Sequence, residues 1–300
     1  MNRRWGVAVG LVIAAGLAVL LGIELVVVLA GGVSGGHQMS LPGMRKVAVL
    51  PVTGIIINTE DYIRFVREQR EDDAVKGLLL RIDSPGGGAA ASQELFTELM
   101  KFRETGRPIV ASVGSLGASG GYYLAAAADT IFVNACSEVG SIGVIMDYYN
   151  VNEMLKKLGI AEQVYTAGRM KDVPSSNRAM TPEETAYLQG ILDDVHQQFI
   201  GDICRGRGMA RSAVAPHADG RIFTGRQALA LGLVDAIGTY EDARDAVARA
   251  AGISGTPHYA EYEPPEEKGL FAAATSFAQR LRALLPPPQA TGGLRFQYAQ

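Results

Sequence analysis

The chain has 300 residues and a net charge of −3, with 48% hydrophobic residues. This length is enough for a substantial core, in one large domain or two small ones. Because no basic stripe occurs in the sequence, nucleic-acid binding is excluded as a main function. The two cysteines, Cys136 and Cys204, are too few for a disulfide framework or a zinc site. We expect each of them to be a small buried hydrophobic residue.

An apolar run at residues 6–32 follows a short basic N-terminus at residues 1–5. About twenty residues suffice to cross a bilayer, whereas the apolar part of a cleavable signal usually has ~7–15. The run is therefore expected to be a permanent transmembrane anchor. Arg3 and Arg4 favour a cytoplasmic N-terminus and place the rest of the chain on the outer face. Glu24 lies toward the outer end of the run, where a carboxylate can reach the interface or be protonated.

Residues 33–44 are rich in Gly and Ser and predict a linker. Beyond them, apolar runs alternate with segments of helical spacing, which predicts an α/β domain with largely parallel strands over residues 45–255. Residues 256–300 change in composition and predict a flexible tail. The expected strands cover residues 46–54, 75–83, 107–114, 130–135 and 143–150, and the expected helices cover residues 59–72, 89–104, 181–208, 224–232 and 241–252.

The helix at residues 181–208 has the clearest start signal in the sequence. Thr181 is expected to cap it, Pro182 occupies the first helical position, and Glu184 completes a capping box. Thr59 is expected to cap the first helix of the domain.

The sequence GASGG around Ser119 matches G-x-S-x-G, the pattern of a nucleophilic serine on a sharp strand-to-helix turn. A strand candidate precedes it and an Ala-rich helical segment follows it, as such a turn requires. Taken alone, a serine between glycines is more often a packing site than a nucleophile.

A serine nucleophile needs a base, and two kinds are available. The histidines of the chain are His37, His196, His217 and His258. The order Ser-Asp-His could be assembled from Ser119, Asp235 and His258, although no local pattern supports it. The other known base is a lysine kept neutral by burial, and Lys171 lies shortly before the helix at 181–208. Taken alone, Lys171 is more readily a surface lysine.

Two further glycine-rich turns carry candidate groups. The glycines of DSPGGG at residues 83–88 let backbone N–H groups point into a cleft, as an oxyanion hole requires. This turn lacks the G-K-[ST] of a phosphate-binding loop. The sequence GSIG places Ser141 at another turn before a strand candidate.

Five segments follow one another in the chain: LLLRIDSPGGG, SLGASGGYYLA, GSIGVI, AGRMKDVPSSNRAMTPEE and GRIFTGRQALALGLVD. Together they resemble the bacterial signal peptide peptidase A family, serine–lysine peptidases related to the Clp protease and crotonase fold. Each segment alone is weak evidence for a family, but five segments in the family's order are specific evidence. The resemblance covers roughly residues 45–250 and implies an α/β core of repeated β-β-α units, with the N-terminal transmembrane helix also fitting.

The resemblance also implies an active site and assigns a role to each of its residues. These are the nucleophile Ser119, the general base Lys171, the supporting Ser141, and the oxyanion-hole glycines Gly87 (or Gly86) and Gly120. Pro174 and Asn177 depart from close relatives, which bears on loop shape and substrate preference rather than on the chemistry. No metal or cofactor is implied.

The function implied is that of a membrane-anchored endopeptidase that degrades cleaved signal peptides and other hydrophobic peptides at the outer face of the cytoplasmic membrane. Members of the family form rings or domes, and in short members serine and lysine can come from neighbouring subunits, so a homo-oligomer is expected. An extended substrate is expected to pair with strand edges near Gly86 and Gly114. Two alternatives stay open: a histidine-dependent α/β-hydrolase esterase and a non-catalytic membrane scaffold of the crotonase fold.

Overall fold

The chain divides into two units, residues 1–44 and 45–300, and the computed structural model describes residues 45–264 of the second. The anchor expected at residues 6–32 and the linker at 33–44 lie outside the described residues. Within residues 45–264, every helix is too short or too polar to cross a membrane.

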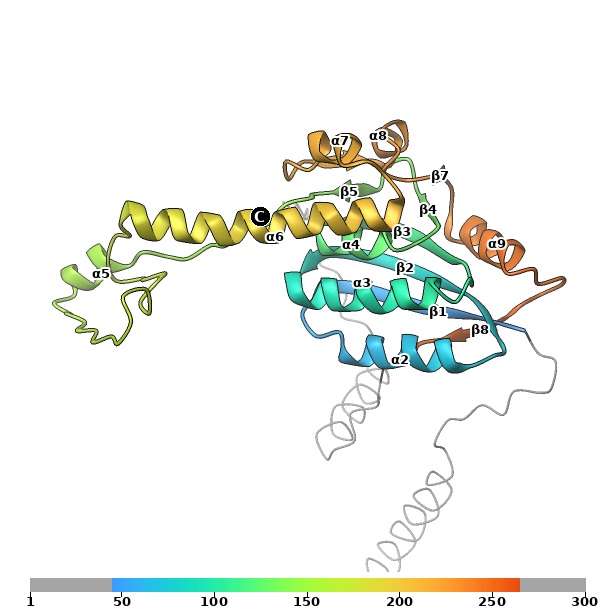
Figure 1. Cartoon of the computed structure of the whole chain (residues 1–300), viewed down its shortest axis with the longest axis horizontal. Coiled ribbons are helices and arrows are strands. Elements are labelled where there is room, and N and C mark those ends of the chain that lie inside the picture. The colour runs from blue at the N-terminus through green and yellow to red at the C-terminus, as the bar shows by residue number, and fades with distance from the viewer. Residues whose placement is uncertain (1–44, 265–300) are drawn as a thin grey trace, which may run out of the picture. The chain divides into compact units, whose positions relative to one another are not determined.

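A mixed sheet of eight strands forms the centre of the described domain, as the alternating apolar runs predict (Figure 1). Its order is β6-β5-β3-β2-β1-β8, with β4 beside β3 and β7 beside β4. The pairs are parallel except for β5 with β6. The strands are β1 (Lys46–Ile56), β2 (Val75–Gly87), β3 (Ile109–Ala118), β4 (Thr130–Val133), β5 (Glu138–Gly140), β6 (Ile222–Thr224), β7 (Ala236–Ile237) and β8 (His258–Glu261).

Helices cover both faces of this sheet, because successive side chains of each central strand point to opposite faces. Leu78 and Leu80 of β2 join the larger core with α3, whereas Leu79 packs with Val247 of α9 on the other face. The helices are α2 (Glu60–Glu71), α3 (Ala89–Arg103), α4 (Gly120–Ala125), α5 (Asn152–Lys157), α6 (Pro182–Arg207), α7 (Arg211–Val214), α8 (Gly225–Ala230) and α9 (Tyr240–Ala250), with a short 3₁₀ turn, η1 (Ala215–His217).

The start signals of two helices have different outcomes. At α6 the Thr181–Glu184 capping box is present and Pro182 is the first helical residue, as predicted. At α2, Thr59 lies at the N-cap without capping through its side chain. Its hydroxyl donates instead to the carbonyl of Ala91, 3.3 Å away.

Three expectations differ from the structure. No strand forms at residues 143–150, because this segment leaves the sheet and residues 145–150 are exposed. β8 lies beyond the expected domain end at residue 255 and pairs in parallel with β1, so the sheet continues into the segment expected to be a tail. Cys136 is exposed, whereas Cys204 packs partly buried against the core.

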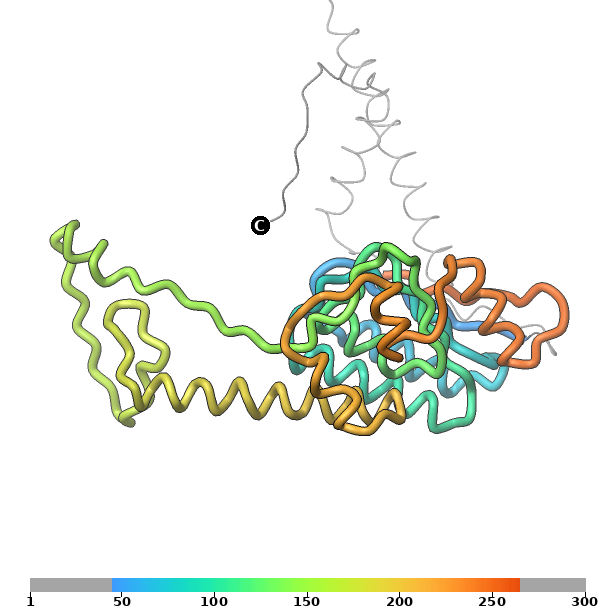
Figure 2. The backbone as a smooth tube through the Cα atoms, turned by 90° about the horizontal axis from the view of Figure 1, so that it is seen from above, coloured from blue at the N-terminus to red at the C-terminus, as the bar shows by residue number. Residues whose placement is uncertain are grey.

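Residues 145–187, which we call the arm, extend away from the sheet and contain α5 and the first turns of α6 (Figures 1 and 2). α6 has 26 residues, a length of roughly 39 Å. Phe199, Ile200 and Ile203 of its C-terminal half belong to the main core cluster, and Leu188 of its N-terminal half is also buried. The two buried residues of the arm, Ser175 and Glu184, are both polar. The arm therefore has no buried apolar side chain of its own.

Candidate active site

Ser119 lies on a sharp turn between the end of β3 and the start of α4, where the G-x-S-x-G pattern placed it. Its φ is +50°, a region that non-glycine residues rarely occupy and that costs free energy unless the surroundings impose it. The surroundings are the neighbouring strand: Ala118 pairs with Gly140, and the Ser119 N–H donates to the Gly140 carbonyl at 2.8 Å.

Ser141 follows β5 in the same way that Ser119 follows β3. Its φ is +52°, and within residues 45–264 these two serines are the non-glycine residues with positive φ. Its N–H donates to the carbonyl of Arg221 at 2.8 Å. Because the register pairs Ala118 with Gly140, the next residues of the two strands leave the sheet side by side. Strained backbone of this kind clusters at functional sites, so both serines are candidates on structural grounds as well.

The turn after β2 packs directly against Ser119, and it has no room for side chains there. A Cβ on Gly86 would lie 2.6 Å from the Gly120 nitrogen and 2.8 Å from Ser119 Cβ. A Cβ on Gly87 would collide with the carbonyl of Ile56. The glycines of DSPGGG therefore permit two backbones to approach at the serine, as the sequence predicts.

Two backbone N–H groups at this contact are placed to receive an oxyanion. Gly120 is the first residue of α4, so its N–H has no partner within the helix. On the facing turn, Gly86 N–H donates to Ser84 Oγ at 3.1 Å, and Gly88 N–H donates to Ile56 O at 2.7 Å. Successive peptide groups of a strand point to opposite sides, so Gly87 N–H points away from β1. The geometry favours Gly87 over Gly86 as the second donor.

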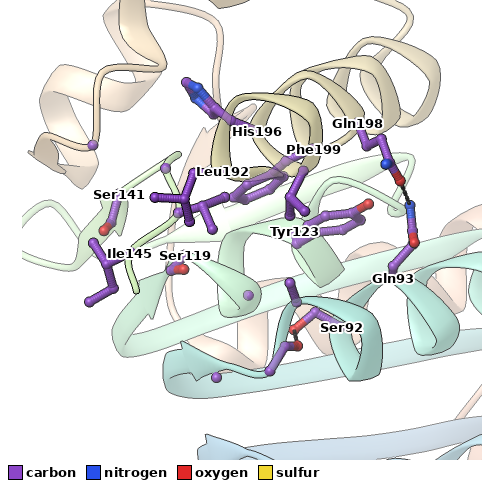
Figure 3. A pocket seen from close by; sticks show the side chains of 18 of the residues that line it. Ser92, Gln93, Ser119, Tyr123, Ser141, Ile145, Leu192, His196, Gln198 and Phe199 are labelled. Atoms are coloured by element: carbon purple, nitrogen blue, oxygen red, sulfur yellow. Dashed lines mark hydrogen bonds between the residues drawn. The ribbon is translucent and has the colours of Figure 1, made fainter. Parts of the chain in front are cut away.

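These groups line a cavity of about 910 Å³ (Figure 3). Ser119 and Ser141 both face it, together with Gly87 and Gly120. Its remaining lining comes from the start of α3, the segment after Ser141, residues 219–220, and the side of α6 from Gln189 to Phe199. A long helix thus covers the cavity that holds the candidate nucleophile.

An aromatic pair forms one wall of the cavity and was not identified from the sequence. The ring of Tyr123 stacks on Phe199 with centroids 4.4 Å apart. Its hydroxyl donates to Asp202, which also accepts from Gln93 at 3.3 Å. Burial, then the hydrogen bond to Asp202, raises the pKa of Tyr123 well above its ordinary value. Tyr123 is therefore a neutral, fixed wall rather than an acid or base near neutral pH.

Lys171 is not among the residues that line this cavity within one chain. It lies on the arm and is exposed to solvent. Its N–H donates to the carbonyl of Gly168 at 3.0 Å, within a tight turn. The structure thus brings together Ser119, Ser141 and the glycines but not the lysine.

The alternative arrangement Ser119–Asp235–His258 is not formed. His258 is on β8, and two strands, β1 and β2, lie between it and the strand of Ser119. Three strand spacings correspond to roughly 14 Å. Asp235 is engaged elsewhere: it pairs with Arg207 at 2.7 Å and accepts from the N–H of Ile131. The histidine-dependent esterase therefore has no triad here.

His196 is the one histidine of the described residues that lines the cavity of Ser119. In Figure 3 its ring points away from Ser119. Sequence analysis names it among the histidines available as a base, without a role of its own. Gly114, expected near a substrate-binding edge, lines a different cavity of about 510 Å³ with Arg81 and Glu138.

Comparison with known proteins agrees with the arrangement around Ser119. The model of peptidase family S49 matches residues 101–254. A putative protease of Synechocystis is 42% identical over 210 residues, which cover 70% of this chain and 76% of that protein. A putative signal peptide peptidase SppA of Enterococcus faecium is 38% identical over 216 residues, covering 68% of this chain and 63% of its own. The chain belongs to peptidase family S49.

A third relative is the chloroplastic serine protease SPPA of Arabidopsis thaliana, 33% identical over 195 residues, which cover 65% of this chain and 29% of that protein. All three relatives are therefore longer than the part that this chain matches, and the match covers less than two thirds of two of them. The resemblance to the signal peptide peptidase A family is confirmed, and the chain is a serine protease.

The contact between Gly120 and the facing turn gives a first test. A Cβ on Gly120 would collide with Ser92 Oγ and lie 3.3 Å from Gly87 N. We expect Gly120→Ala to lower kcat by about tenfold or more, since small displacements at a reacting centre are costly. Ser92→Ala removes the colliding oxygen, so the double variant S92A/G120A should recover part of the loss in a peptidase assay.

Gly87→Ala is the matched control for this pair. Its Cβ would meet the backbone carbonyl of Ile56, so Ser92→Ala should not rescue it. Equal activities of G120A and S92A/G120A would contradict the packing account.

Proposed function

We propose that the chain is an endopeptidase with a Ser119/Lys171 dyad that degrades cleaved signal peptides and other hydrophobic or unfolded peptides at the outer face of the cytoplasmic membrane. The observation that carries the proposal is the strained turn at Ser119, packed against the Gly86–Gly87 turn in a covered cavity. A core of the Clp protease and crotonase type, with β-β-α repeats, is part of the proposal. The Enterococcus relative is a putative signal peptide peptidase, which supports the substrate class.

In the proposed reaction, neutral Lys171 takes the proton from Ser119 Oγ as this oxygen attacks a peptide carbonyl. The N–H groups of Gly87 and Gly120 stabilise the resulting oxyanion, at roughly 3–4 kcal/mol for a donor of this kind. The lysine ammonium then protonates the leaving amine. Lys171, which is neutral again after this transfer, activates a water that hydrolyses the acyl-enzyme. Ser141, beside Ser119, would hold the lysine amine in place.

Lys171 needs a second chain to act in this way. A lysine accepts a proton only when it is neutral, and burial away from water favours the neutral form. In one chain Lys171 is exposed and outside the cavity of Ser119. We therefore propose a homo-oligomer in which the arm of one subunit brings Lys171 to Ser119 of its neighbour.

The surface of the arm supports such an assembly. Large apolar side chains on it are exposed, and exposed apolar surface of this extent is typical of an interface. They include Ile145 (89% exposed), Tyr149 (81%), Leu158 (65%) and Tyr165 (89%). Because no apolar side chain is buried within the arm, a neighbouring subunit would supply the missing apolar contacts.

The lining of the cavity supports apolar substrates. Ala89, Ala90, Leu192, Val195 and Phe199 contribute apolar surface around Ser119. The main chain of an extended peptide would lie along the turn at Gly86 and Gly87, with its side chains against this surface.

The first test removes the proposed dyad. We expect Ser119→Ala and Lys171→Ala each to lower kcat on a signal-like peptide by at least about a thousandfold. The controls are Ser115→Ala, an exposed serine on β3, the strand that leads into the turn at Ser119, and Lys157→Ala, an exposed lysine on α5. An active K171A protein would remove the dyad, and an active S119A protein would support the scaffold alternative.

The second test addresses the shared site. S119A and K171A chains, made together, should form mixed oligomers in which an intact lysine reaches an intact serine of the neighbouring chain. Random mixing leaves both groups intact in about one quarter of sites, if each site uses two chains. S119A mixed with S119A/K171A is the inactive control. Complete inactivity of the first mixture, in oligomers shown to contain both chains, would refute the shared site.

The third test concerns the membrane. The full-length chain should remain in the membrane fraction after an alkaline wash, since the run at residues 6–32 is long enough to span a bilayer. In cells stripped of their outer layers, protease added outside should digest the domain, as the N-terminal arginines favour an inside N-terminus. A protected domain, or release of the chain by the wash, would contradict this location.

A further inference from the structure

The position of Lys171 within the arm must be set by something other than a hydrophobic core. Between residues 145 and 187 the buried residues are Ser175 and Glu184, both polar. The apolar side chains of the arm are at most partly buried, as at Met170, Val173 and Met180, and the nearest buried one is Leu188, just beyond the arm. Because apolar packing is this sparse, the polar contacts of the arm carry much of its order.

Arg178 makes more side-chain hydrogen bonds than any other residue of the arm. Its guanidinium donates to both carboxylate oxygens of Glu184, at 2.7 and 2.8 Å, in a bidentate pair. It also donates to Asp172 Oδ2 at 2.9 Å and to the Asp172 carbonyl at 3.4 Å. Asp172 is the residue after Lys171, so Arg178 holds both the side chain and the main chain next to the lysine.

The other groups of this cluster connect it to the rest of the arm. Glu184 accepts the N–H of Thr181 at 2.8 Å, which fixes the cluster to the start of α6. On the other side, the amide of Asn150 donates to the Arg178 carbonyl at 3.2 Å. The N–H of Val151 donates to the carbonyl of Ser176 at 2.7 Å. Arg178 thus connects the segment at Asn150 and Val151, the turn that carries Lys171 and the start of α6.

The cluster keeps its charge over the pH range in which a peptidase is assayed. The hydrogen bonds from Arg178 and from the Thr181 backbone lower the pKa of Glu184 to about 2. A depressed carboxylate pKa means that the pairing is present above the ordinary value and is lost only as pH falls through about 2.

We propose that Arg178 is a positioning residue for catalysis: it fixes Asp172 to the start of α6 and so sets the location of the Lys171 side chain. This inference rests on the proposed Ser119/Lys171 dyad. It adds a residue that neither lines the cavity of Ser119 nor contributes a reacting atom. A planar guanidinium suits this role because its five donors reach two carboxylates and a carbonyl at once, which a lysine ammonium cannot do in the same geometry.

The chain offers a matched control in Arg169. This arginine lies in the same loop and also pairs with the first turn of α6, through Glu183 at 2.5 Å. That pair is exposed, with 71% and 60% of the two side chains accessible, and exposed pairs of this kind contribute little. Arg169→Gln therefore removes one arginine from the same segment without breaking the cluster.

The experiment measures kcat and KM on a signal-like peptide for the full-length variants R178Q, R178K and R169Q, alongside K171A. We expect R178Q to lower kcat by about a hundredfold with KM within about twofold, R178K to lose less, and R169Q to stay near wild type. Arg178→Ala, which leaves space for a small ion, should regain part of its kcat on addition of millimolar guanidinium. Size-exclusion mass and thermal midpoint report the oligomer and the fold of each variant.

Two results would overturn the inference while leaving the dyad intact: K171A is inactive but R178Q keeps its kcat, or every Arg178 variant dissociates or melts early without recovery by lysine or guanidinium. An active K171A would instead refute the dyad itself, and with it the lysine that Arg178 positions.

Discussion

The close contact between the turn at Ser119 and the turn at Gly86–Gly87 is the constraint on which the rest of the site depends. Parallel strands β2 and β3 end at the same edge of the sheet, and their following turns meet there because the facing residues lack side chains. β5 completes the arrangement, since the Gly140 carbonyl holds the strained Ser119 backbone. The strain is tolerated because a strand on one side and a glycine turn on the other impose it.

α6 links two parts of the molecule that are built on different physical principles. Its C-terminal half is anchored by Phe199, Ile200 and Ile203 in the apolar core and covers the cavity. Its N-terminal end carries the arm, where charged and polar contacts around Arg178 replace apolar packing. The nucleophile is thus held by a sheet and its core, and the proposed base by a polar cluster on an extended support.

This division accounts for the exposed character of Lys171 in a single chain. A proposed site that draws its serine from a rigid core and its lysine from a neighbour's arm is complete only in the assembly. In the proposed assembly, exposed apolar residues such as Tyr149 and Tyr165 would contact the partner subunit. The same arrangement would keep an isolated chain inactive, because the serine lacks a base within its own subunit.

From the sequence alone, the α/β class, the parallel sheet, the capping box of α6 and the turn at Ser119 could be predicted, because each depends on local patterns of apolar period, cap residues and glycine. The family resemblance added Lys171 and Ser141. The apolar content of residues 143–150 predicts a strand, but this segment pairs with no strand and leaves the sheet. The wall formed by Tyr123 and Phe199 and the contacts that meet at Arg178 were decided by tertiary structure. These features join residues distant in the chain, and no local spacing records which of them will meet.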